Sequence, residues 1–267
     1  MNQLLDVAAL IENHISDCQK ILPVIEIYPC LQGEGSHRGI PTIAIRTTGC
    51  THRCYFQGDS WCDSWYSSIH AEKGKYSFND IIKVINQHPH INEIMLTGGS
   101  PTMHPQLLCA LSIIAHNYKL KITLETEGSH FVETPYPLAL ISVSPKFSNT
   151  IPTIGELTPK GKPTTKKMIE QHNKYRLNYQ AIKKMLSYHC DYQIKPVFDG
   201  NEQTLKEIIQ FCQQLNIPYN KVFLMPHGQT RKTLIKAYSK TMETCLKFGF
   251  SFTGRDHIIA YGDKRYV

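Results

Sequence analysis

The stretch EIMLTGGSP (residues 93–101) is followed by a helix-like segment near 105–116 and then by KITLETEG (121–128). Both short apolar segments are typical of buried strands, and both end in glycine and polar residues. A strand, a helix and a second strand in this order form the repeating unit of a parallel sheet. We therefore predict an α/β fold from this stretch.

The same alternation extends in both directions along the chain. We predict further strands at VIEIY (24–28), TIAIRT (42–47), ALISVS (139–144), YQIKPV (192–197) and KVFLM (221–225), and further helices near 78–87, 165–187, 202–215 and 230–248. About six strand–helix units indicate a partial or modified (β/α)6 barrel. Apolar spacing over 4–18 predicts an added N-terminal helix, so the expected domains are a helical extension (1–22) and a core (23–267).

Composition limits the function classes. The chain has 267 residues, 41% apolar residues and a net charge of +7, which suits a globular protein with an anionic ligand. No apolar run approaches the roughly 18 residues that a membrane span needs, and no signal-peptide pattern is present. Neither zinc-finger spacing nor an aromatic-interleaved basic pattern occurs. We expect a cytoplasmic protein that binds neither membranes nor nucleic acids directly.

Unusual residues follow four of the predicted strands. Active sites of parallel barrels lie at the carboxyl ends of the strands. In this chain those ends hold TGGSP (97–101), ETEG (125–128), SPK (144–146) and MPHG (225–228), so we expect the four motifs to share one rim. Residues 147–165 are rich in Thr, Pro, Gly and Lys, which predicts a long loop or a mobile lid.

Cysteine spacing points to a metal site. Six of the nine cysteines are isolated and are expected to be small buried apolar residues: Cys18, Cys30, Cys109, Cys190, Cys212 and Cys245. Cys50, Cys54 and Cys62 instead fall within thirteen positions. With His52 they would complete a zinc site, although structural zinc usually draws paired ligands from two separated knuckles. Alternatively, three thiolates would hold a [4Fe-4S] cluster and leave one iron open. The spacing favours the cluster.

From about residue 24 to its end, the chain resembles the 7-carboxy-7-deazaguanine synthase family, radical S-adenosylmethionine enzymes of the queuosine pathway. The resemblance rests on EIYPCLQGEGSHRGIPTIAIRTTGC (26–50), WCDS (61–64), the motifs TGGSP, ETEG and SPK, and RDHIIAYGDKRYV (255–267). Two departures stand out. The second cysteine interval is seven residues, where the family often has two. The Gly-Gly-Glu-Pro common in the superfamily is here 98–101, with Ser100 in place of glutamate, so a carboxylate is lost although the backbone could still meet the methionine amino group.

The resemblance implies a role for each matched residue. The cluster ligands would be Cys50, Cys54 and Cys62. The residues that contact S-adenosylmethionine would be Trp61, Asp63, Gly99, Ser144, Pro145, Lys146, Met225, Pro226, His227 and Gly228. The residues that bind the substrate would be Leu31, Gln32, Gly33, Arg46, Thr97 and His257. Arg46 would hold the substrate carboxylate, and Ser64 would bind Mg2+.

The implied reaction converts 6-carboxy-5,6,7,8-tetrahydropterin into 7-carboxy-7-deazaguanine with loss of ammonia. A 5′-deoxyadenosyl radical would abstract the hydrogen at C6, Mg2+ would assist the ring contraction, and no side chain would act as the catalyst. The resemblance also implies an electron donor such as flavodoxin or ferredoxin, and a homodimer. Two alternatives stay open: another radical enzyme such as a glycyl-radical activase, and a non-catalytic zinc-binding or nucleic-acid-binding module.

Overall fold

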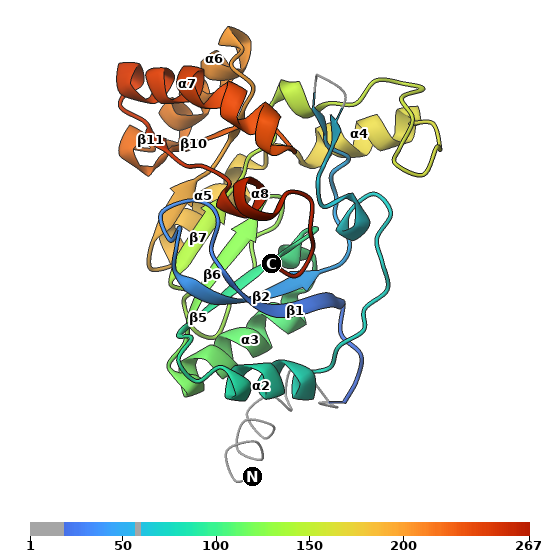
Figure 1. Cartoon of the computed structure of the whole chain (residues 1–267), viewed down its shortest axis with the longest axis vertical. Helices are drawn as coiled ribbons and strands as arrows, with labels where there is room; N and C mark the ends of the chain where they lie inside the picture. Colours follow the sequence, from blue (N-terminus) through green and yellow to red (C-terminus); the bar gives the residue numbers. More distant parts are fainter. Residues whose placement is uncertain (1–18, 57–59) are drawn as a thin grey trace.

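The computed structural model describes residues 19–56 and 60–267, with a six-stranded sheet at its centre (Figure 1). Its order is β1-β2-β5-β6-β7-β8. The parallel strands are β2 (Pro41–Thr47), β5 (Glu93–Gly98), β6 (Lys121–Thr126), β7 (Leu140–Val143) and β8 (Tyr192–Ile194). The α/β class and the parallel sheet are confirmed.

The first strand runs the other way. β1 (Val24–Leu31) pairs antiparallel with β2, with Ile27 opposite Ile45. Only residues 32–40 join the two strands, and a parallel connection needs a crossover of a dozen or more residues. The parallel sheet predicted from the alternation therefore begins at β2.

The predicted strand 192–197 is divided in two. Lys195 and Pro196 separate β8 from β9 (Val197–Phe198), which pairs with β10 (Phe223–Pro226), and β10 pairs in turn with β11 (Ser251–Phe252). Pro196 has no amide hydrogen to donate to a neighbouring strand. A single bridge between Ile194 and Val222 links the two sheets. Within residues 19–56 and 60–267, no strand pairing closes the sheet into a full barrel.

Four predicted helices are present with closely matching bounds: α2 (Phe78–Gln87), α3 (Pro105–Tyr118), α6 (Glu202–Leu215) and α7 (Arg231–Phe248). The single helix predicted over 165–187 is wrong, since α4 (Lys166–Tyr175) and α5 (Tyr179–Tyr188) are separate. Asn178 begins α5 as its N-cap, and its Oδ1 accepts from the amide of Ala181 at 3.1 Å. An N-cap residue has non-helical backbone angles, so one continuous helix cannot pass through position 178.

Shorter elements complete the chain. The two-residue strands β3 (Tyr55–Phe56) and β4 (Ser60–Trp61) pair with each other, and α8 (Asp256–Tyr261) lies near the C-terminus. The 3-10 turns are Trp65–Ser67, Pro101–Met103, Ser148–Thr150 and Tyr219–Lys221. Residues 151–164 form an irregular loop, in which Leu157 and Pro163 make an antiparallel β-bridge.

Part of the core lies between the sheet and helices α2 and α3, which Figure 1 shows below it, and the core continues into α5, α6 and β10. Ile43 of β2, Ile94 of β5 and Ile141 of β7 are completely buried, and α2, which contacts β1, adds residues at helical spacing to the same core, Phe78, Ile81, Ile82 and Ile85. Figure 1 shows α8 and the C-terminus on the other side of β1 and β2 from α2 and α3. This leaves the rim of the sheet accessible to the C-terminal segment.

Two predictions concern the N-terminal region and membranes. The helix predicted over 4–18, together with Cys18, lies outside the described residues. In the described part of the chain, no helix combines the length and the apolar character needed to cross a membrane.

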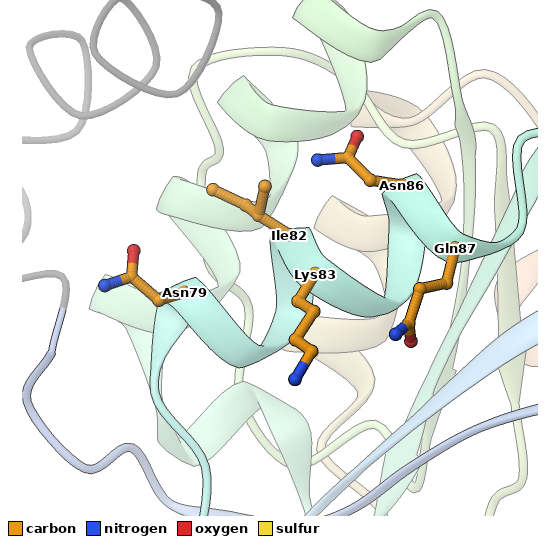
Figure 2. A pocket seen from close by; sticks show the side chains of 5 residues that line it. All are labelled: Asn79, Ile82, Lys83, Asn86 and Gln87. Carbon is orange, nitrogen blue, oxygen red and sulfur yellow. The ribbon is translucent and has the colours of Figure 1, made fainter. Parts of the chain in front are cut away.

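One surface hollow lies away from the strand ends. The described residues that line it all belong to α2: Asn79, Ile82, Lys83, Asn86 and Gln87 (Figure 2). These side chains include neither a thiol nor a carboxylate nor an imidazole, so the hollow offers none of the chemistry that the sequence motifs indicate.

Candidate active site

The segment after β2 holds the three clustered cysteines. The Cys62 amide donates to the Cys54 carbonyl at 3.0 Å, and Tyr55 lies opposite Trp61 where β3 and β4 pair. The described residues of the seven-residue interval form the strand pair β3–β4, and the backbone bond between Cys54 and Cys62 lies at the base of this pair. The departure in spacing leaves these two thiols on one compact loop.

Burial governs the chemistry of these thiols. It raises the pKa of Cys54 to about 12 and that of Cys62 to about 11. Burial, with help from the charge of Glu127, also holds the pKa of Cys50 well above its usual value. The thiolate is the form that binds metal, and a cationic centre among the thiols would favour it. Within the described residues, no three His, Cys, Asp or Glu side chains lie close enough to share a single metal ion.

The strand-end motifs meet around this loop. The Ser100 amide donates to the Gly49 carbonyl at 2.8 Å, and a Cβ on Gly99 would overlap that carbonyl, so only glycine allows this approach. The Ser144 amide donates to the Thr126 carbonyl at 2.7 Å, and Lys146 Nζ donates to Ser144 Oγ at 2.6 Å. TGGSP thus packs beside the cysteines, and SPK lies beside ETEG, as the expected common rim requires.

The fourth motif also reaches the cysteine loop. The His227 ring stacks on Phe56 with centroids 4.9 Å apart, and its Nε2 lies 3.1 Å from Ser60 Oγ. The amides of Met225 and His227 donate to the carbonyls of Pro196 and Phe198, as strand β10 requires. Residues 225–228 are therefore placed against the loop that holds Cys54 and Cys62.

Trp61 connects the cysteine loop to the long loop that follows β7. Its indole Nε1 donates to the Leu157 carbonyl at 2.8 Å, and its own carbonyl accepts from Gln229. The Trp61 side chain is buried. The loop 147–165, predicted to be a lid, is thus tied to the cysteine loop through Trp61, while its mobility stays a prediction.

Arg46 and Thr97 are direct neighbours on β2 and β5. Arg46 Nε donates to Glu26 Oε2 at 2.7 Å, and its other nitrogens lie 3.4 Å from Ser64 Oγ and from the Tyr28 hydroxyl. Glu26 is completely buried, so this pair fixes the guanidinium. Its Nη1 faces Ser64, two residues after Cys62, and its Nη2 faces the Tyr28 hydroxyl.

The turn after β1 meets the C-terminal segment. A Cβ on Gly33 would overlap the imidazole of His257, so the predicted substrate residues Gly33 and His257 are packed together. The side-chain Nε2 of Gln32 donates to Glu125 Oε1 at 3.4 Å, and the Gln32 side chain is buried. The Leu31 side chain is 62% exposed, so the structure does not bring it among the other site residues.

An ion network that the sequence did not reveal crosses this rim. Lys195 Nζ lies 2.7 Å from Glu34 Oε2 and 2.6 Å from Glu125 Oε2, while Arg255 pairs with both Glu34 and Asp63. Burial alone would raise the pKa of Asp63, but Arg255 outweighs it and lowers that pKa to about 2. A lysine inside the apolar segment YQIKPV was the available signal, because buried charges need partners.

Ser64 lies between opposite charges. Its Oγ donates to Asp63 Oδ1 at 3.2 Å and accepts from Arg46 at 3.4 Å. Two oxygen atoms of the kind that bind metal ions, Ser64 Oγ and Asp63 Oδ1, are therefore adjacent at the position predicted to hold Mg2+, with the Arg46 guanidinium beside them.

The isolated cysteines divide into three groups. Cys212 and Cys245 are buried as predicted, and Cys30 and Cys109 are half-buried. The prediction is wrong for Cys190, which is exposed because it lies in the bend between α5 and β8 rather than on an inward-facing position.

Comparisons with known proteins identify the family of the chain. No protein-family model matches the chain. The 7-carboxy-7-deazaguanine synthase of Halobacterium salinarum is 30% identical over 247 residues, which cover 91% of each chain. That of Rhodopirellula baltica is 28% identical over 246 residues, covering 91% of this chain and 88% of the relative. The crystal structure of QueE from Escherichia coli shares the fold, with a TM-score of 0.59, 21% identity, and coverage of 87% of this chain and 92% of that one. Because 30% identity extends over 91% of both chains, this chain belongs to the 7-carboxy-7-deazaguanine synthase family.

Proposed function

We propose that this chain is a radical S-adenosylmethionine enzyme that converts 6-carboxy-5,6,7,8-tetrahydropterin into 7-carboxy-7-deazaguanine with loss of ammonia. The observation that supports this most is the compact loop of three cysteines at the carboxyl end of β2, in which Cys54 is buried, Cys50 and Cys62 are half-buried, and the Cys62 amide bonds to the Cys54 carbonyl. The same rim holds Arg46, Gln32 and His257, the residues that the family resemblance assigns to the substrate.

The donor set fits a [4Fe-4S] cluster. Such a cluster usually takes four thiolates, and this loop provides three, which leaves one iron for an exchangeable ligand. When bound, the cluster and S-adenosylmethionine would supply the electron and the carbon radical that removes hydrogen from the substrate. The cysteines hold the cluster, while the neighbouring strand ends position and shield it.

The chain's own residues bind and orient the substrate. Arg46 is held by Glu26 through Nε, and its two other nitrogens make longer contacts of 3.4 Å with Ser64 and Tyr28. Each of these nitrogens has a second hydrogen for the substrate carboxylate, and a planar fork suits that group. The Gln32 amide can both donate to and accept from the edge of the pterin ring. His257, packed on Gly33 and 3.8 Å from Glu34, closes the site from the C-terminal segment.

Mg2+ at Ser64 belongs to the same proposal. Ser64 Oγ and Asp63 Oδ1 are adjacent oxygen donors, and Mg2+ typically takes one or two protein oxygens together with substrate oxygens and waters. The guanidinium of Arg46 beside Ser64 repels a cation, so an anionic substrate would be needed to bring the two together. We therefore expect Mg2+ to bind with the substrate.

The test is an anaerobic assay with reconstituted protein, S-adenosylmethionine, the tetrahydropterin, Mg2+ and a chemical reductant in place of flavodoxin or ferredoxin. We expect the ring-contracted product and an equal amount of ammonia. Formation of 5′-deoxyadenosine without this product would show that a radical enzyme acts on another substrate, such as a glycyl-radical partner protein. Zinc without iron, and no iron–sulfur charge-transfer absorbance, would overturn the proposal.

A further inference from the structure

Glu127 is a buried carboxylate with one unpartnered oxygen. Its side chain lies at the end of β6, and the residue is 5% exposed. Oε1 accepts from Ser100 Oγ at 2.6 Å, from Thr51 Oγ1 at 3.5 Å and from the Ser129 hydroxyl. Oε2 has no hydrogen-bond partner within the described part of the chain. All three bonds therefore converge on one oxygen and leave the other bare.

The carboxylate also has no strong cationic partner. Across residues 19–56 and 60–267, no lysine or arginine pairs with Glu127, and His52 Nδ1 is 3.9 Å from Oε1, beyond hydrogen-bond distance. The other nitrogen of His52, Nε2, is likewise buried without a partner. A buried carboxylate is strongly unfavourable unless a cation or several donors compensate it. Three hydroxyls bond to Oε1 of Glu127, whereas Oε2 is a free acceptor without a cation beside it, which suits a positively charged donor.

The position of Glu127 indicates which positively charged donor fits there. Its bonds reach Thr51, next to Cys50, and Ser100, whose amide is bonded to the Gly49 carbonyl. The carboxylate is therefore enclosed by the cysteine loop and the TGGSP turn. Ser100 occupies the position where the superfamily commonly has glutamate, so the carboxylate absent from position 100 is matched by one on the neighbouring strand end.

We propose that Glu127 Oε2 accepts a hydrogen bond from the α-ammonium group of S-adenosylmethionine, which makes Glu127 a cofactor-binding residue. This inference rests on the proposed function. An ammonium has three donors and no acceptor, and an ionised carboxylate only accepts, so the two groups are complementary. Ser100, Thr51 and Ser129 hold the carboxylate so that Oε2 stays available.

The experiment measures ligand affinity rather than turnover. Anaerobically reconstituted wild-type protein and Glu127→Gln are titrated with S-adenosylmethionine and with its deamino analogue, in which hydrogen replaces the α-amino group. For the variant we expect affinity for S-adenosylmethionine to fall roughly 10- to 100-fold, as for loss of a charged hydrogen bond, and affinity for the analogue to change by less than about 2-fold. The exposed Glu133→Gln serves as the matched control and should leave both affinities unchanged.

Two further variants separate binding from a structural role. Glu127→Asp keeps the charge on a shorter side chain and should retain part of the discrimination between the two ligands. Ser100→Glu combined with Glu127→Gln returns the carboxylate to position 100 and should restore part of the lost affinity. Iron and sulfide content must equal that of the wild type in every variant compared.

The outcomes distinguish a failure of the proposed role of Glu127 from a failure of the proposed function. Equal affinity losses for both ligands, or no loss for either, would overturn the role of Glu127 while the proposed function stands. A wild-type protein with an intact cluster that binds neither ligand would overturn the proposed function and this inference together.

Discussion

The cysteine loop and the Lys195 network lie on the same rim but differ in how completely their polar groups are satisfied. In the loop, three thiols have raised pKa values, and His52 Nε2 lacks a partner within the described residues. Beside the loop, at the end of β6, Glu127 Oε2 also lacks a partner there. In the network, Lys195 is paired with two carboxylates, and Arg255 continues the chain of ion pairs. The first region has polar groups that the proposed cluster and cofactor would complete, whereas the second has its charges paired within the chain.

The largest expected effect concerns the cysteine loop. Cys54→Ser removes one of three cluster ligands, so reconstituted protein should contain little iron or sulfide and should lack the charge-transfer absorbance. Iron and sulfide analysis measures this directly. Cys190→Ser, at an exposed thiol outside the loop, is the control and should match the wild type. A Cys54→Ser protein with full cluster content would remove Cys54 from the ligand set.

The next effect concerns the Lys195 network. Lys195→Met leaves Glu34 and Glu125 without their shared cation, and breaking a buried ion pair costs about 3–5 kcal/mol of the free energy of unfolding. Urea denaturation should show this loss without any ligand present. Lys221→Met, which breaks an exposed pair with Asp191, should cost no more than about 1 kcal/mol. Similar losses in the two variants would contradict the contrast between the regions.

A smaller effect concerns pH and the anchoring of the cysteine loop. His172 is completely buried, its Nδ1 accepts from the Arg53 amide at 3.1 Å, and burial, followed by nearby positive charge, lowers its pKa to about 3. The unfolded chain, with an ordinary histidine pKa of about 6.5, binds the proton first. The free energy of unfolding should therefore be largest above about pH 6.5 and decrease as the pH falls toward 3.

Urea midpoints of the cluster-free protein at several pH values test this dependence. His172→Gln does not titrate and should flatten part of the slope, while the remaining slope comes from other buried histidines such as His189, whose pKa burial lowers to about 4. An unchanged slope in His172→Gln would show that this histidine does not contribute.

The smallest expected effect concerns the loop 147–165. Trp61→Phe keeps an aromatic ring but removes the hydrogen bond to the Leu157 carbonyl, which is worth about 1 kcal/mol. Limited proteolysis should then cut residues 151–164 faster than in the wild type. S-adenosylmethionine and substrate should slow this cleavage if the loop acts as a lid. Identical cleavage with and without both ligands would count against a lid.

Local sequence patterns predicted most of the helices and strands, whereas ion-pair partners far apart in the sequence could not be predicted. Helix α2 has apolar residues at regular spacing and a capping box from Ser77 to Asp80, so its bounds follow from neighbouring residues. The break between α4 and α5 depends on one capping asparagine inside a helix-like stretch. Glu34 and Glu125 lie 161 and 70 positions from Lys195, so only the fold brings them together.

The site shows the same limit. Motif order predicted the clustered cysteines and the shared rim of the strand-end motifs, whereas the family resemblance assigned Gly33 and His257, which the structure packs together, to the substrate. Neither predicted a role for Glu127, because its significance depends on the serine at position 100 of a neighbouring strand end. Leu31 was assigned to the site from a motif, yet its side chain is mostly exposed.

The strand pair β3–β4 has a consequence for how such sites can vary between proteins. Since the amide of Cys62 bonds to the carbonyl of Cys54, residues added beyond that contact lengthen the pair without separating the two thiols. Loop length then carries only a small entropic cost. Cysteine spacing can therefore drift between related chains while the geometry of their ligands is preserved, and a search pattern with a fixed interval would overlook chains that hold their cysteines in this way.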